Sequence, residues 1–208
     1  MTTGGGRGRG EPWDQRLARA LVRPLVATPV TPNHVTALSL LVGLTAGACY
    51  AAGGAAAHWG GALLMASLLI DHADGELARM SGKTSVFGHY FDYVSDGVVL
   101  VAAFTGMGVG LPEGALGGWA VLAGIAAGTA IAATFLLRDA MSRRHGQEAI
   151  AQPTIGGFEV QDVMYLVGPI TWLGGLAPFL ALAGVGAPLF LLWQLWDFRR
   201  VAREGAAP

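Results

Sequence analysis

The chain has 208 residues, of which 53% are hydrophobic and only 13% are charged, and its formal net charge is -1. A soluble domain usually carries about 25% charged residues, so this composition excludes an ordinary soluble domain and indicates a polytopic membrane protein. The single cysteine, Cys49, excludes an intramolecular disulfide and a zinc site made of several thiolates, and the absence of a basic run with interleaved aromatic residues predicts no nucleic-acid partner.

The N-terminal region is predicted to contain a short tail and an amphipathic helix. Residues 1–12 are rich in glycine, and we expect them to be disordered. After them, apolar residues recur every four positions, whereas arginines fall on the other faces; the apolar residues are Trp13, Leu17, Leu21 and Leu25. This pattern is typical of a helix that lies in a membrane interface. The alternative is an ordinary amphipathic helix that packs against the rest of the protein.

Six apolar segments are candidates to cross a bilayer, which takes about 20 residues each. They are Val35–Ala52, Trp59–Met80, Phe87–Gly110, Ala115–Leu137, Val163–Leu182 and Gly186–Val201. The second and third segments qualify only if the aspartates near their ends are tolerated. We therefore predict an all-α fold: a single membrane domain over residues 13–203 with six transmembrane helices and the N-terminal interfacial helix, followed by a tail at 204–208.

The basic residues predict the orientation of these spans. All thirteen lie in the N-terminal region, in the connections between spans two and three and between spans four and five, or near the C-terminus, which places them on one side of a six-span protein. The connections near 53–58, 110–114 and 183–185 contain none. Because positive residues accumulate on the cytoplasmic side, we predict a multi-pass protein of the cell (inner) membrane with both termini in the cytoplasm.

Four aspartates lie near the ends of spans two and three. The connection between these spans, about 81–86, is short, so the two helices should run antiparallel side by side. Asp71 and Asp96 are separated from the middle of this connection by the same number of residues, and Asp74 and Asp92 by nearly the same number. Residues three or four positions apart share one face of a helix. The four carboxylates can therefore converge at one depth, near the cytoplasmic end.

Carboxylates clustered in this way require protons or cations, because like charges in a low-dielectric site cannot all remain ionised. A set of oxygen ligands without His or Cys favours Mg²⁺, with Mn²⁺ as an alternative. The spacing does not fit an EF-hand loop, because Ala73 and Gly75 stand where oxygen ligands are needed. The alternative is that the aspartates only cap helix ends, although ionisable residues inside membranes are usually functional.

The residues between the aspartates suggest a phosphate ligand. Gly75, Ala78 and Gly88 leave room beside the carboxylates for a ligand to approach the backbone. Arg79 places a permanent positive charge with several donors next to them, which suits a phosphate group. Cations and an arginine together imply a substrate that contains a pyrophosphate.

The motif resembles that of a known family. The pattern Asp71-x2-Asp74-Gly75-x2-Ala78-Arg79-x8-Gly88-x3-Asp92-x3-Asp96 agrees at every fixed position with the signature of the class-I CDP-alcohol phosphatidyltransferase family. The motif covers only residues 71–96, but the predicted spans and interfacial helix are also similar to the family's architecture. An inactive relative would be expected to have lost at least one of the fixed positions, and this sequence has lost none of them.

The resemblance implies an activity and a role for each motif residue. The expected reaction transfers a substituted phosphate from a CDP-alcohol, usually CDP-diacylglycerol, to an acceptor hydroxyl and releases CMP, in phospholipid biosynthesis. Two Mg²⁺ ions would be held by the aspartates, and Asp96 would also be the general base. The residues expected to bind the CDP part are Gly75, Ala78, Arg79, Ser85 and Gly88. A homodimer is expected by the same analogy.

The sequence TPNHVT, residues 31–36, is a second and shorter match to the family, where it often precedes the first span. Thr31 and Pro32 suit the N-cap and first position of a helix, which is a sufficient structural explanation. A helix N-terminus also offers free N–H groups to an anion. We therefore predict nucleotide contacts from Asn33 and Thr36.

The acceptor is a small polar alcohol whose identity the sequence leaves open: glycerol 3-phosphate, inositol phosphate and serine all remain candidates. Arg138, Arg143 and Arg144 can hold an acceptor's phosphate, although the positive-inside rule explains them equally well. Asp162 can meet a hydroxylated or cationic acceptor, or simply begin a helix. His72 lies at a variable position of the motif, where it can bias the choice of acceptor.

A different class of function is a transporter of divalent cations or one coupled to protons, since acidic residues inside a helical bundle also mark ion pathways. The acids here lie near one face of the membrane, and broken helices at mid-membrane are not evident. The sequence therefore favours the transferase.

Overall fold

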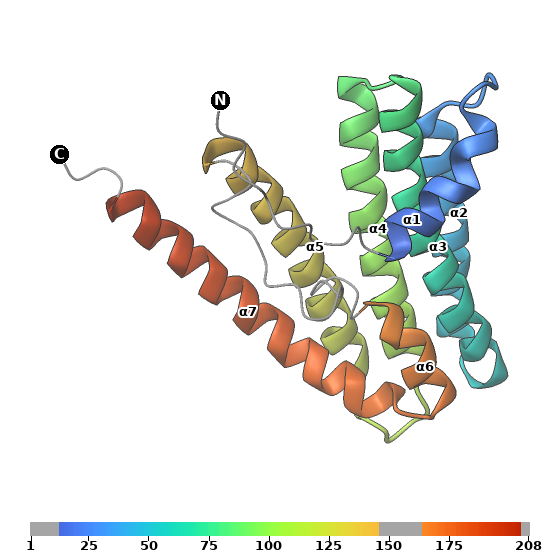
Figure 1. Cartoon of the computed structure of the whole chain (residues 1–208). Helices are drawn as coiled ribbons and strands as arrows, with labels where there is room; N and C mark the ends of the chain where they lie inside the picture. The colour runs from blue at the N-terminus through green and yellow to red at the C-terminus, as the bar shows by residue number, and fades with distance from the viewer. Residues whose placement is uncertain (1–12, 146–163, 205–208) are drawn as a thin grey trace.

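Figure 1 shows the computed structural model, which describes residues 13–145 and 164–204. The described residues form helices and no β-strand. In chain order these are α1 (Trp13–Val22), the short 3-10 helix η1 (Arg23–Leu25), α2 (Pro32–Ala52), α3 (Gly54–Ser81), α4 (Val86–Gly110), α5 (Trp119–His145), α6 (Val167–Trp172) and α7 (Leu176–Glu204). The predicted all-α class is confirmed.

Helices α2, α3 and α4 form the part of the bundle that carries the motif. A short connection, residues 82–85, joins α3 to α4, and Gly82 ends α3 in the left-handed conformation with φ +67°. The expected hairpin is therefore present. Helix α2 contacts both of its arms much more extensively than the arms contact each other. The prediction that α3 and α4 lie side by side thus holds only in part, because α2 fills much of the seam between them.

Small residues allow α2 and α4 to approach closely. A Cβ atom on Gly106 of α4 would lie 2.2 Å from the carbonyl oxygen of Gly47 in α2, and one on Gly47 would lie 2.9 Å from the carbonyl oxygen of Ala102. Even alanine at Gly106 would therefore push the two helices apart. Such backbone contacts are typical of helices that associate in lipid, where dispersion forces replace the hydrophobic effect between helices.

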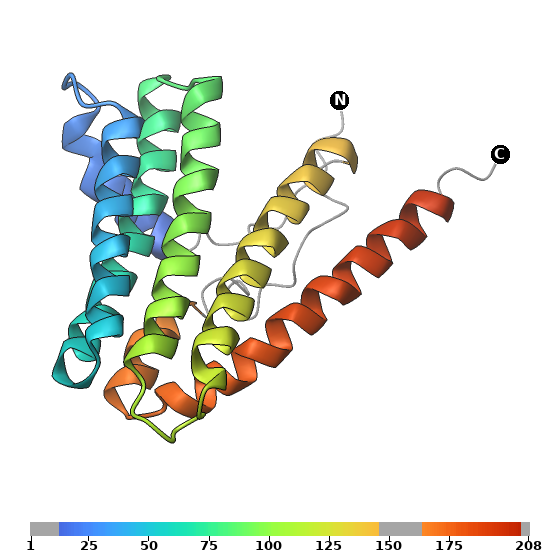
Figure 2. The ribbon, with the colours of Figure 1, turned by 180° about the vertical axis from the view of Figure 1, so that it is seen from behind.

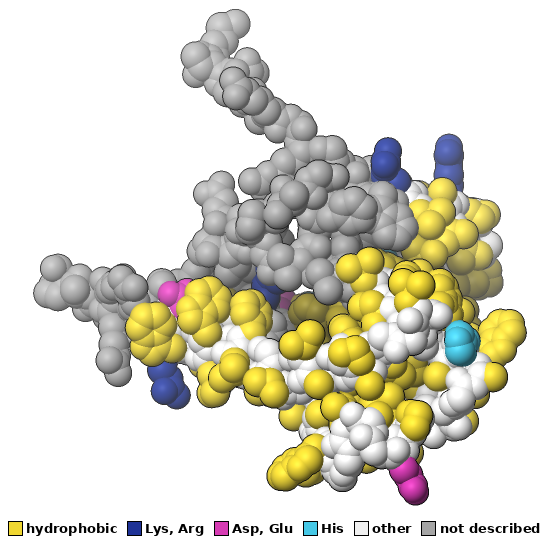
Figure 3. Space-filling view, turned by 90° about the horizontal axis from the view of Figure 1, so that it is seen from below, with side chains coloured by type: hydrophobic (Ala, Val, Ile, Leu, Met, Phe, Trp, Pro, Cys, Tyr) yellow, Lys and Arg dark blue, Asp and Glu magenta, His cyan; other side chains and the backbone are white. Residues whose placement is uncertain are grey.

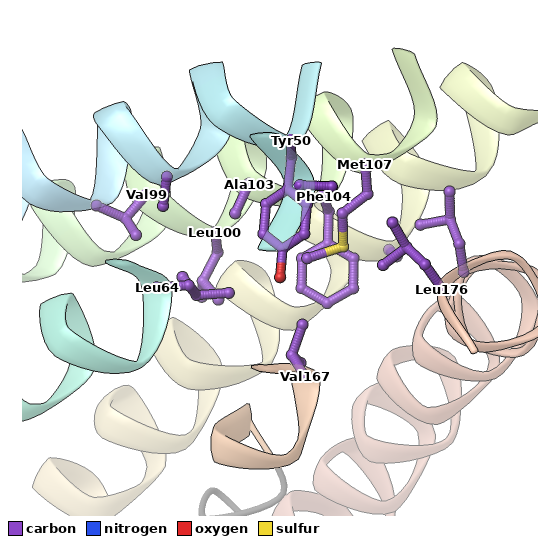
Figure 4. Close-up of a cluster of buried hydrophobic side chains, with 13 residues drawn as sticks. Tyr50, Leu64, Val99, Leu100, Ala103, Phe104, Met107, Val167 and Leu176 are labelled. Atoms are coloured by element: carbon purple, nitrogen blue, oxygen red, sulfur yellow. The ribbon is translucent and has the colours of Figure 1, made fainter. Parts of the chain in front are cut away.

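Figure 4 shows the hydrophobic core, to which the helices from α2 to α7 contribute. Tyr50 and Phe104 are completely buried there, together with Leu64 and Met107. The Tyr50 hydroxyl lies 3.1 Å from Thr171 Oγ1 of α6, so the polar end of this ring has a partner inside the core. The core thus fixes α6 against α2 and α3.

Helices α5 and α7 lie beside this bundle, and α7 diverges from α2, α3 and α4 (Figure 2). The predicted connection at 183–185 is wrong, because α7 continues without a break from Leu176 to Glu204. A Cβ atom on Gly184 would lie 2.7 Å from Ala123 Cβ of α5. Gly184 thus serves a close contact between two helices, which is the physical reason why this small-residue stretch is not a turn.

Helix α1 lies where the N-terminal helix was expected, and its two faces have different surroundings. Ala18 and Val22 are buried against Ala73 and Leu77 of α3, as the packing alternative expects. Leu17 is 42% exposed and Leu21 is 51% exposed. An exposed apolar edge suits a helix that lies in a membrane interface, and that location stays a prediction.

Four of the described helices are long and apolar enough to cross a membrane: α2, α4, residues 119–141 of α5 and residues 176–199 of α7. The predicted number of six spans is not confirmed. Helix α3 is long but charged toward its end, and the fifth predicted span divides between the short helix α6 and the start of α7. In the view of Figure 3, hydrophobic side chains cover much of the described surface, as expected of a protein surrounded by lipid.

Candidate active site

The four aspartates of the motif come from the two arms of the α3–α4 hairpin. Asp71 and Asp74 lie in α3, and Asp92 and Asp96 lie in α4. One carboxylate oxygen from each of Asp71, Asp74 and Asp92 lies within 4.8 Å of the other two. The structure thus brings three of the four predicted metal ligands close enough together to share one cation.

Asp96 adjoins this group of three. Its carboxyl group contacts that of Asp71, and both side chains line one cavity together with Asp92. Because Asp96 lies one turn beyond Asp92 on α4, it reaches the side of the cluster that faces this cavity. The predicted convergence of all four aspartates is therefore observed.

The buried oxygens of the cluster fit a divalent cation. Asp71 Oδ1 and Asp92 Oδ1 are buried, and within the described parts of the chain neither has a hydrogen-bond partner. A buried carboxylate oxygen without a partner is costly, and several together are more so. A hard cation with oxygen ligands, such as Mg²⁺, would satisfy both atoms and offset the negative charge.

Thr36 of α2 also belongs to this cluster. Thr36 is buried, and its Oγ1 donates a hydrogen bond to Asp74 Oδ2. We predicted that Thr36 contacts the nucleotide, but its hydroxyl is directed at a carboxylate of the cluster. This contact orients Asp74, as outer hydrogen bonds commonly do for metal ligands.

The starts of α2 and α4 lie next to each other beside the cluster. Ser85 is the N-cap of α4 and accepts a hydrogen bond of 2.9 Å from the Gly88 N–H. A Cβ atom on Gly88 would lie only 2.7 Å from Asn33 Oδ1. Lys83 Nζ donates to the carbonyl oxygens of Thr28 and Val30, which ties the α3–α4 connection to the segment before α2. Three predicted CDP-binding residues, Asn33, Ser85 and Gly88, are thus neighbours.

Arg79 lies one turn beyond Gly75 on α3. A Cβ atom on Gly75 would lie 3.6 Å from both terminal nitrogens of Arg79, so the guanidinium extends over the glycine. Arg79 Nη2 donates to Glu76 Oε1 at 2.7 Å, and the Arg79 side chain is 62% exposed. Ala78, the other small residue predicted to adjoin the donor, is half-buried in the same turn. Arg79 is therefore held by Glu76 and is still accessible to a ligand.

The predicted acceptor residues have different outcomes. Arg138 lines the cavity with Asp71, Asp92 and Asp96. Arg143 and Arg144 lie in the last turns of α5 and not in a connection, because α5 extends to His145. Their side chains, and Asp162 as a whole, lie outside the described residues.

The cavity beside the aspartates has a volume of about 390 Å³, within the usual range for small-molecule sites. Five polar lining residues were not predicted from the sequence: Ser39, Ser67, Tyr93, Asp139 and Tyr165. His72 also lines it, and the Tyr165 hydroxyl lies 3.4 Å from His72 Nδ1. Asp139 could have been suspected from its place beside Arg138, whereas only the fold brings Tyr165 of the chain's last third to α3.

The fold and site define a helical membrane protein with a cluster of acidic side chains beside a cavity. The sequence model of the CDP-alcohol phosphatidyltransferase family matches residues 29–194, and the chain belongs to this family. The chain is also similar to a protein of Rubrobacter xylanophilus named bifunctional IPC transferase and DIPP synthase, with 33% identity over 102 residues. That alignment covers 48% of this chain and 23% of the relative.

Proposed function

We propose that the protein transfers a substituted phosphate group from a CDP-alcohol, with CDP-diacylglycerol as the donor, to the hydroxyl of a small polar alcohol. The observation that carries this proposal is the group of carboxylate oxygens from Asp71, Asp74 and Asp92 within 4.8 Å of one another. Family membership supports the same reaction class.

The chemistry assigns each part of the site a task. The acceptor oxygen forms a bond to the phosphorus atom next to the diacylglycerol, the bond from that phosphorus to the CMP oxygen breaks, and CMP leaves. Asp96 takes the proton of the acceptor hydroxyl, since its carboxyl group borders both the cluster and the cavity. Two Mg²⁺ ions, or Mn²⁺ in their place, held by the four aspartates would supply charge stabilisation for the diphosphate.

The CDP part of the donor would lie where α2 and α4 begin and α3 ends. Arg79 would hold a phosphate through its exposed N–H groups, and its guanidinium extends over Gly75, at ordinary contact distance from where a Cβ would stand. Asn33, Ser85 and Gly88 lie together at the adjacent helix starts, where N–H groups suit an anion. This arrangement supports a donor bound across the open end of the hairpin.

The acceptor would occupy the 390 Å³ cavity. Arg138, which is half-buried in the cavity wall, supports a phosphorylated acceptor such as glycerol 3-phosphate or inositol phosphate, because a guanidinium can bind phosphate through two parallel N–H groups. His72, Tyr165 and Asp139 add groups that can bind hydroxyls. The distribution of basic residues supports a location of this end of the protein on the cytoplasmic side of the cell membrane, and a homodimer is the expected assembly.

The proposal is tested by CMP release from CDP-diacylglycerol, with the full chain purified in detergent and supplied with Mg²⁺. Parallel reactions contain glycerol 3-phosphate, inositol phosphate, serine or no acceptor. We expect release that depends on one phosphorylated acceptor and a lipid product that contains it. A preference for serine would overturn the role of Arg138, and the absence of CMP release with every acceptor would overturn the donor or the reaction.

A further inference from the structure

Glu76 is an acidic residue of α3 that the aspartate cluster does not include. Its side chain is only 2% exposed, yet it lies among the last residues of the helix, between Asp74 and Arg79. Its two oxygens have separate partners: Oε1 accepts from Arg79 Nη2 at 2.7 Å, and Oε2 accepts from Arg19 Nε at 3.1 Å. Glu76 therefore links α1 to the arginine of the motif.

A buried carboxylate persists in a fold only when its charge is matched and its oxygens are hydrogen-bonded. Both conditions hold for Glu76, and both depend on arginines that are themselves largely exposed, at 47% for Arg19 and 62% for Arg79. The buried member of the trio is thus fixed in place, whereas its partners reach the surface. A fixed acceptor restricts the orientation of a long side chain that otherwise samples many rotamers.

The direction of the Arg79 guanidinium follows from this contact. Glu76 binds one terminal nitrogen of Arg79. Both terminal nitrogens then lie 3.6 Å from the position that a Cβ on Gly75 would take, and Gly75 directly follows Asp74. Because the guanidinium is planar and its donors form a rigid fork, fixing one nitrogen also fixes the direction of the others. Arg79 is thereby aimed along the helix face that carries Asp71 and Asp74.

We propose that Glu76 is a positioning residue that holds Arg79 ready for the diphosphate of the donor. The proposal rests on the donor site described under the proposed function. It assigns to a variable position of the motif a role in donor affinity, which acts through Arg79 and not through direct contact with the substrate.

A purely structural role for Glu76 would act through the other partner, Arg19, by fastening α1 to α3. The apolar contacts of Ala18 and Val22 with Ala73 and Leu77 already hold these two helices together. The variant Arg19→Gln therefore removes the ionic link to α1 while it leaves the Glu76–Arg79 pair intact, which makes it the matched control.

The experiment measures the Kd of CDP in the presence of Mg²⁺ by calorimetry, with the full chain in detergent. The variants are Glu76→Gln, Glu76→Asp, Arg19→Gln, Arg79→Ala and the double variant Glu76→Gln/Arg79→Ala. We expect Glu76→Gln to raise the Kd about 10-fold, in the range found for coupled residues of one network. Arg19→Gln should stay within about 2-fold of the wild-type Kd, and Glu76→Asp, which keeps the charge, should lie between wild type and Glu76→Gln.

The decisive comparison is the effect of Glu76→Gln in the Arg79→Ala background. If Glu76 acts through Arg79, the double variant binds CDP as Arg79→Ala does. Additive losses, or a loss in Arg19→Gln as large as that in Glu76→Gln, would overturn the positioning role. If Glu76→Gln does not fold, an unchanged Kd in Glu76→Asp would overturn it instead. Wild-type protein that does not bind CDP would overturn the proposed function itself, whereas CDP binding that is indifferent to Glu76 would overturn only this inference.

Discussion

The Thr36 hydroxyl of α2 donates a hydrogen bond to the Asp74 carboxylate of α3, and both side chains are buried where the two helices meet. The two residues are 38 positions apart in the chain, so this contact exists only because α2 packs along α3. It connects the short TPNHVT sequence to the aspartate motif. We therefore expect Thr36 to act through the orientation of the Asp74 carboxylate.

Replacing the hydroxyl tests this link. Thr36→Val should raise the Mg²⁺ concentration for half-maximal CMP release about 10-fold, because loss of an outer hydrogen bond commonly weakens metal affinity by that amount or more. Thr36→Ser, which keeps the hydroxyl, should remain near wild type. Thr45→Val is a suitable control, since Thr45 is exposed on the same helix and its hydroxyl donates within that helix, to the Leu41 carbonyl. An unchanged Mg²⁺ dependence in Thr36→Val would separate Thr36 from the metal site.

Removal of divalent cations should abolish activity. The clustered carboxylates of Asp71, Asp74 and Asp92 need positive charge both to coexist and to accept a diphosphate. CMP release should stop in EDTA and return with Mg²⁺ or Mn²⁺. Mg²⁺ should also raise the Tm of the detergent-solubilised chain, because a cation that binds only the folded state stabilises it. Full turnover in EDTA would refute the metal assignment.

Arg79→Lys should weaken donor binding although it conserves the charge. An ammonium group cannot reproduce the planar fork that bonds Glu76 and a phosphate at once. We expect the KM for the CDP-donor to rise about 10-fold, in line with the loss of one charge-assisted hydrogen bond of roughly 1.5 kcal/mol. Arg23→Lys, at an exposed arginine of η1, serves as the control. An unchanged donor KM and kcat would remove Arg79 from the site.

Asp96→Asn separates proton transfer from binding. Asparagine keeps the shape and one oxygen toward the cluster but cannot accept the acceptor's proton. Turnover should fall at least ~100-fold, the usual effect of removing a general base, whereas CDP binding in Mg²⁺ should change little. Asp71→Asn, which alters the carboxylate at the centre of the cluster, should weaken metal and CDP binding together. If Asp96→Asn keeps near-normal turnover, or loses only metal binding, another residue is the base.

Local spacing was sufficient to predict that the four aspartates converge. Asp71 and Asp74 share a face because they are three residues apart on a helix, and the short α3–α4 connection brings Asp92 and Asp96 to the same depth. The hydrophobic segments likewise predicted α2, α4 and the greater part of α5. These features depend on helical geometry and on apolar length, which neighbouring residues alone determine.

The tertiary structure alone decided the features that join distant segments. It directs Thr36 to Asp74, buries Glu76 between Arg19 and Arg79, and brings Tyr165 to His72 beside Arg138. It also continues α7 through Gly184, where the glycine packs on α5 and makes no turn. A small residue in an apolar stretch is compatible with a turn or with a close contact between helices. A polar side chain is likewise compatible with several different partners. The choice depends on which helix lies opposite, and packing of the whole bundle determines that.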